Sequence, residues 1–145
     1  MTVHILILNG PNLNLLQYRD PSLYGGRSME QIILEVQKAH PQVRFTYHQT
    51  NHEGQLIDLL HETITADEPS YNGIILNAGG YTHTSVSLRD AIELCRIPVI
   101  EVHLSNIDAR EDFRRIDLLR DVCTTRILGK DCYEKATDYI LTHTL

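Results

Sequence analysis

Short apolar runs alternate with segments of helical periodicity along this chain, and this alternation limits its fold more than any other feature. Nearly continuous apolar runs cover residues 3–8 and 73–77, and a further strand is predicted over 99–103. Between them, apolar residues recur at helical spacing over 29–36 and 88–95. Buried strands connected through helices form a parallel sheet, because each crossover helix returns the chain to the same end of the sheet. The sequence therefore predicts an α/β protein.

Weaker segments complete the pattern. Residues 43–48 alternate apolar and polar side chains, which is typical of a half-exposed strand at a sheet edge. A helical stripe follows over 56–64, a weaker fifth strand over 122–128 and a closing helix over 133–140. With an edge second strand and a buried first strand, the prediction is a flavodoxin-like doubly wound five-stranded parallel sheet with helices on both faces.

Size, charge and cysteine content narrow the class of protein. A chain of 145 residues is expected to form a single domain, 1–145. A net charge of −6 without a Lys/Arg run disfavours a nucleic-acid partner. No apolar stretch matches a membrane span and the first residues lack a signal peptide's basic flank, so we expect a cytoplasmic protein without a membrane partner. Cys95, Cys123 and Cys132 lack paired spacing, which favours reduced thiols that serve as packing residues.

Polar residues gather where the predicted strands end. The first strand ends at Asn9 and leads into 11–14, the third ends at Asn77, and the fourth leads into 101–106. In doubly wound sheets, ligands bind beyond the carboxyl ends of the strands. Amide, imidazole and hydroxyl groups at these ends suit a small polyhydroxylated or carboxylated molecule that is recognised through hydrogen bonds.

The segment 15–26 is long for a strand-to-helix connection, and we interpret it as an active-site lid. It carries Arg19 and Tyr24. A cation beside a phenol favours the phenolate form, so an Arg19 close to Tyr24 would make the tyrosine a candidate general base.

His103 and Glu101 are two residues apart on a predicted buried strand, so both side chains point to the same face. Glu101 could orient the imidazole and keep it protonated, which would make His103 a general acid that expels a hydroxyl group as water. A base and an acid on opposite sides of one pocket suit a β-elimination, with amide donors such as Asn12 stabilising the enolate.

Other interpretations stay open at this point. Tyr24 could be a packing anchor and His103 a hydrogen-bonded interior histidine. The charged run 110–115 could be a solvated helical face. No His/carboxylate cluster has metal-ligand spacing, and no lysine follows an apolar strand, so we expect neither a metal site nor Schiff-base chemistry. A flavodoxin-like small-molecule binding module that performs no chemistry is the alternative to an enzyme.

Four motifs resemble those of the type II 3-dehydroquinases, over about residues 3–115. They are LNGPNLNLL at 8–16, QTNHEG at 49–54, YTHTS at 81–85 and EVHLSN at 101–106. The resemblance implies a cofactor-free hydro-lyase of the shikimate pathway, hence of aromatic amino acid biosynthesis. Such an enzyme converts 3-dehydroquinate to 3-dehydroshikimate by anti elimination through an enolate, without metal or imine.

The resemblance also implies individual roles and an assembly. The implied catalytic positions are Asn12, Arg19, Tyr24, Glu101 and His103. The implied substrate-binding positions are Asn77, His83, Asp90, Leu104, Ser105 and Arg114. Asp90 would reach into the site of a neighbouring subunit, since the family assembles trimers into a homododecamer. The chain departs from the family pattern at Gln17, at 78–80, at Asp108 and in the segment after Arg115, and none of these departures removes an implied catalytic group.

Overall fold

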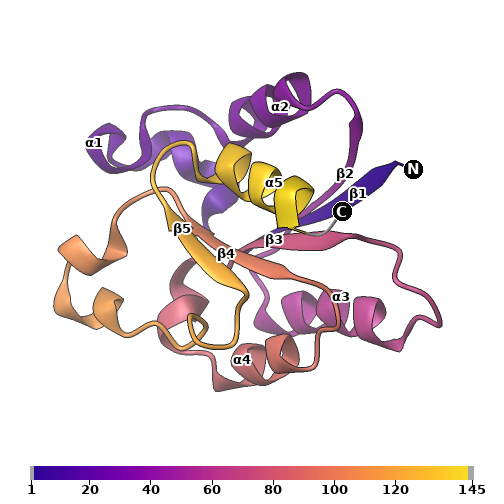
Figure 1. Ribbon diagram of the computed structural model, residues 1–145. Helices are drawn as coiled ribbons and strands as arrows, with labels where there is room; N and C mark the ends of the chain where they lie inside the picture. Colours follow the sequence, from indigo (N-terminus) through magenta and orange to yellow (C-terminus); the bar gives the residue numbers. More distant parts are fainter. Residues whose placement is uncertain (1, 144–145) are drawn as a thin grey trace.

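A five-stranded parallel sheet forms the centre of the computed structural model, which describes residues 2–143 (Figure 1). The strand order is β2-β1-β3-β4-β5. The strands are β1 (Val3–Asn9), β2 (Val43–Gln49), β3 (Gly73–Asn77), β4 (Val99–His103) and β5 (Thr125–Leu128). All four strand pairings are parallel. The predicted flavodoxin-like order is therefore confirmed, with β2 at one edge and β1 inside the sheet.

Helices cover both faces of the sheet. Helices α2 (Met29–Ala39) and α5 (Cys132–His143) lie on one face, and α3 (Glu53–Thr65) and α4 (Val86–Glu93) lie on the other (Figure 1). The start of α2 is set by a capping box, in which Ser28 and the Gln31 side chain each satisfy a backbone N–H of the other. None of the helices within residues 2–143 has the length and apolar character needed to cross a bilayer.

The connections at the carboxyl end of the sheet are helical rather than irregular. The segment 15–26, expected to be a loop, instead folds into the 3-10 helix η1 (Leu13–Tyr18) and the short α1 (Pro21–Tyr24). The Asp20 side chain accepts a hydrogen bond from the Ser22 N–H and so caps the start of α1. In the sequence an aspartate before a proline is typical of a turn as well as of a helix cap, so composition alone did not distinguish the two. Further 3-10 helices are η2 (Gly79–His83), η3 (Ile107–Ala109) and η4 (Asp112–Arg115). The fifth strand is shorter than predicted, because 122–124 do not join the ladder.

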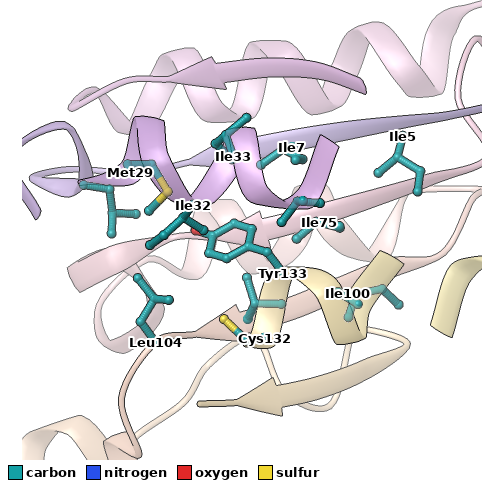
Figure 2. Close-up of a cluster of buried hydrophobic side chains, with 14 of the residues drawn as sticks. Ile5, Ile7, Met29, Ile32, Ile33, Ile75, Ile100, Leu104, Cys132 and Tyr133 are labelled. Carbon is teal, nitrogen blue, oxygen red and sulfur yellow. The ribbon is translucent and has the colours of Figure 1, made fainter. Parts of the chain in front are cut away.

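Tyr133 at the start of α5 connects the core to the strand ends. Figure 2 shows its ring among the isoleucines of α2 and of the sheet, in a cluster of buried side chains. Tyr133 is 1% exposed, and its hydroxyl donates to Asn9 Oδ1 at 2.7 Å and accepts from Asn77 Nδ2 at 3.1 Å. Asn9 and Asn77 are partners in the β1–β3 register. One phenol therefore satisfies two buried amides at the carboxyl ends of neighbouring strands.

Replacing Tyr133 with Phe is expected to lower the free energy of unfolding by about 1–3 kcal/mol, because both amides would lose a buried hydrogen-bond partner. Denaturant unfolding measures this loss. Tyr139→Phe is the matched control on the same helix, because no hydrogen bond of the Tyr139 hydroxyl is found within residues 2–143. Equal stability of the two variants would contradict the role assigned to the Tyr133 hydroxyl.

Candidate active site

A polar pocket of about 160 Å³ lies at the carboxyl end of the sheet. Its walls come from the segments that follow β1, β3 and β4, because parallel strands bring their carboxyl ends to one edge. The structure brings together these predicted residues in its lining: Asn12, Arg19, Tyr24, Asn77, His83, His103, Leu104, Ser105 and Arg114. Two predicted residues lie outside the lining, since Glu101 is buried behind His103 and Asp90 lies on α4.

The turn after β1 places Asn12 at the pocket. Asn12 has a left-handed backbone with φ of 70°, and its N–H donates to Asn51 Oδ1 at 3.1 Å. The turn passes so close to the one after β3 that a Cβ on Gly10 would lie 2.5 Å from the carbonyl oxygen of Ala78. A side chain at position 10 would therefore force the two turns apart, so glycine is required there.

Tyr24 is held between two arginines. The tyrosine is 6% exposed, and the Arg19 guanidinium carbon lies 4.3 Å from the centre of its ring. The contact with the hydroxyl comes from Arg110, whose Nη1 donates to Tyr24 Oη at 2.7 Å and to Ser105 Oγ at 3.1 Å. Arg19 thus approaches Tyr24 as predicted but contacts the ring face.

Sequence reasoning missed Arg110, because it left the charged run 110–115 open as a solvated face. The 3-10 turns η3 and η4 replace the helix that such a face would need. They direct Arg110 and Arg114 into the pocket and leave Arg115 exposed. The signal available in the sequence was the position of Arg110 shortly after the polar end of β4.

His103 and Glu101 form a buried pair at the end of β4. Their Nε2 and Oε2 atoms are 2.6 Å apart, and Glu101 is fully buried. Burial raises the pKa of Glu101 and lowers the pKa of His103, because desolvation disfavours the charged form of each group. Both directions favour the form in which Glu101 carries a proton and His103 is uncharged. These directions run against the expectation that Glu101 keeps the imidazole positively charged.

A second layer of charge lies behind this pair. Asp117 has a carboxylate oxygen within 4.8 Å of ligand atoms of both Glu101 and His103. Arg126 of β5, the register partner of Glu101, contacts Asp117 at 3.3 Å and Asp108 at 2.6 Å. The Glu101–His103 separation of 2.6 Å is that of a hydrogen bond, and two ligand atoms of one metal ion lie farther apart. The cluster therefore suits a proton better than a metal ion.

Several other lining side chains already have protein partners. Asn77 Oδ1 accepts from the Gly79 N–H at 3.2 Å, while its amide nitrogen is held by Tyr133. His83 Nδ1 lies 2.7 Å from the carbonyl oxygen of Ile116 and can donate to it, and Arg114 Nε donates to Glu111 Oε2 at 2.8 Å. These bonds orient the side chains before any ligand binds.

Fold and site together define a flavodoxin-like α/β protein with a polar pocket in which a buried tyrosine lies between two cations. Residues 3–141 match the family Dehydroquinase class II. A protein of Exiguobacterium sp. named 3-dehydroquinate dehydratase is 49% identical over 128 residues, covering 88% of this chain and 85% of the relative. A second relative of that name, from Rhizobium etli, is 46% identical over 131 residues, covering 89% of this chain and 88% of the relative.

Solved structures agree with these matches. The type II dehydroquinase of Butyrivibrio crossotus superposes with a TM-score of 0.89 at 35% identity, covering 97% of this chain and 98% of that one. The enzyme of Propionibacterium acnes gives a TM-score of 0.88 at 29% identity, with 98% of each chain covered. The chain therefore belongs to the class II dehydroquinases, a family of enzymes, and the resemblance seen in its motifs is confirmed.

Proposed function

We propose that this chain is a 3-dehydroquinate dehydratase, the hydro-lyase of the shikimate pathway that forms 3-dehydroshikimate and water. The observation that carries the proposal is the Arg110–Tyr24 hydrogen bond in a pocket that His103 also lines. It places a phenol that accepts a hydrogen bond from a guanidinium, and an imidazole, around one small polar space. The names of the relatives support the same activity.

The proposed reaction is an anti elimination through an enolate. The Tyr24 phenolate takes the C2 proton, and the electron pair of the C–H bond becomes the enolate of the C3 carbonyl. Asn12 stabilises that enolate, in the proposal through a bound water. The enolate then forms the C1–C2 double bond as the C1–O bond breaks, and the hydroxyl group leaves as water with a proton from His103. Anti geometry requires Tyr24 and His103 to act on opposite faces of the substrate ring.

The remaining lining residues are assigned to substrate binding. Asn77, His83 and Arg114 would hydrogen-bond the hydroxyl groups, and the turn at Leu104 and Ser105 would bind the carboxylate through its N–H groups and the serine hydroxyl. We assign no cofactor and no metal to the reaction. The enolate formed from the C3 carbonyl can be stabilised by hydrogen-bond donors, so the residues of the site supply the chemistry.

We extend the proposal to the architecture of the working enzyme. Residues 1–145 act as one catalytic domain with 15–26 as its lid, in a cytoplasmic homododecamer built from trimers. Asp90 would then complete the site of a neighbouring subunit. Exposed apolar side chains near the pocket, among them Phe113 and Ile116, offer surface for such contacts.

The decisive experiment mixes the purified chain with 3-dehydroquinate and follows the absorbance of the conjugated enone. Turnover that survives a chelator, and that survives borohydride added with substrate, supports dehydration without metal or imine. Tight binding of 3-dehydroquinate without enone formation would instead establish the non-catalytic binding module.

Replacing Arg110 with Met is expected to lower kcat by about 10–100-fold, because the Tyr24 phenolate would lose a charge-assisted hydrogen bond. Steady-state kinetics on 3-dehydroquinate measure the change. Arg115→Met is the control, since that side chain is 62% exposed and does not line the pocket. A kcat for the Arg110 variant equal to that of the control would remove Arg110 from the activation of Tyr24.

A further inference from the structure

Asp117 lies behind the Glu101–His103 pair and outside the lining of the pocket. Its side chain is 4% exposed. Asp117 Oδ1 accepts from the N–H groups of Leu119 at 2.9 Å and Arg120 at 3.1 Å, and Oδ2 faces Arg126 at 3.3 Å. A carboxylate that accepts these bonds is held in one place and in its ionised form. Asp117 is thus a fixed negative charge beside the pair.

The second carboxyl group near His103 is that of Glu101, which is fully buried. Glu101 Oε1 is fully buried and has no hydrogen-bond donor within the described part of the chain, whereas Oε2 faces His103. An ionised Glu101 would place two buried carboxylates within 4.8 Å of each other with an oxygen left unpaired. Protonation of the Glu101–His103 pair removes this conflict.

We propose that Asp117 is a positioning residue whose fixed charge, balanced by Arg126, keeps one proton on the Glu101–His103 pair for delivery to the departing hydroxyl group. This inference rests on the proposed dehydratase function. His103 Nδ1 makes no hydrogen bond to any of residues 2–143, so it is the ring nitrogen left for a ligand. During elimination the Nδ1–H proton goes to the hydroxyl group, and the Glu101 proton moves to Nε2. Glu101 is left as the carboxylate until Tyr24 releases the C2 proton to solvent and a proton from solvent returns to Glu101.

The direction of the effect follows from the charges around the pair. Burial is the largest influence on both groups; Asp117 raises the pKa of Glu101 and of His103, and Arg126 lowers both. Burial opposes ionisation of Asp117, but the neighbouring Glu101 carboxyl, the hydrogen bond from the Leu119 N–H and the charges of His103 and Arg126 more than offset this and lower the pKa of Asp117. The other titratable or charged groups that act on the pair or on its two charged neighbours are Asp108, Arg120, His83 and the Cys123 thiol. Asp117 and Arg126 should therefore shift the titration of the pair in opposite directions.

The test compares Asp117→Asn with Arg126→Met. In Asp117→Asn the loss of negative charge should move the basic limb of the kcat–pH profile to lower pH by about one to two units, with KM changed little. In Arg126→Met the same limb should move to higher pH. Asp121→Asn is the matched control, because Asp121 ties the same loop to Arg89 but does not approach the pair. Its profile should match that of the parent.

A second readout uses the resting protein. The ring ¹⁵N resonances of His103, assigned with His103→Ala, should titrate at lower pH in Asp117→Asn and at higher pH in Arg126→Met. Shifts of both variants in the same direction, or no shift in correctly folded Asp117→Asn, would overturn the proposal. The resonances report on the effect of Asp117 even if the parent fails to dehydrate 3-dehydroquinate. Failure of the proposed dehydratase function can therefore be distinguished from failure of the role proposed for Asp117. If Asp117→Asn does not fold, the shift in Arg126→Met decides the question alone.

Discussion

Replacing Tyr24 with Phe is expected to lower kcat on 3-dehydroquinate by about 10²–10⁴-fold while KM stays within a few-fold of the parent. The substitution removes only the hydroxyl group, which is the proposed proton acceptor. The ring stays in place under Arg19, whose guanidinium lies over its face. Because the lost interaction matters in the transition state more than in substrate binding, the effect should appear in kcat.

Tyr18→Phe is the matched control for this change. Tyr18 ends the neighbouring η1 helix and is 79% exposed, so removal of its hydroxyl should leave kcat unchanged. Steady-state kinetics at several pH values measure both variants. Turnover of the Tyr24 variant within tenfold of the parent would show that another group removes the C2 proton.

Replacing His103 with Ala is expected to slow dehydration by about 10²–10⁴-fold, because no group would remain to protonate the leaving hydroxyl group. Tyr24 does not depend on His103, so removal of the C2 proton should continue. The enolate would then take up a proton again rather than lose water. Substrate recovered from D₂O should therefore carry deuterium at C2, although little product forms.

Two measurements decide the role of His103: enone absorbance gives the rate of dehydration, and mass spectrometry of recovered 3-dehydroquinate gives the rate of exchange. His61→Ala, a substitution of an exposed histidine on α3, is the control and should retain both parent rates. A loss of exchange equal to the loss of dehydration in the His103 variant would assign His103 to enolate formation. Dehydration within tenfold of the parent would exclude it as the general acid.

The fold was predictable because the positions that become buried carry apolar residues, which recur in the sequence at the spacing of a strand or a helix. The fully buried β3 appears as a nearly continuous apolar run, β4 has three apolar residues around the Glu101 and His103 of the site, and the half-exposed β2 appears as an alternation. The segment 15–26 was harder, because its two short helices are too brief for a periodic pattern. The start of β5 was placed too early for a related reason, since a four-residue strand with partly buried side chains has little pattern.

The candidate site was predictable where its residues end a strand, as Asn77 and His103 do, or follow one closely, as Asn12 does. Arg110 and Tyr24 are 86 positions apart, and no local pattern links them. Arg126 did carry a signal, namely a charged residue inside a predicted strand, but its partners Asp108 and Asp117 could not be inferred from that signal.

The sequence by itself determined the five strands, the four longer helices, their order and the family, because local periodicity and contiguous motifs encode burial and chemistry within short stretches. Only the tertiary structure decided which cation contacts the Tyr24 hydroxyl and which charges surround Glu101 and His103. Those contacts depend on strand register and on the path of 3-10 turns. A shift of one residue in either would direct the same side chains elsewhere, so the electrostatics of the site belong to the folded chain.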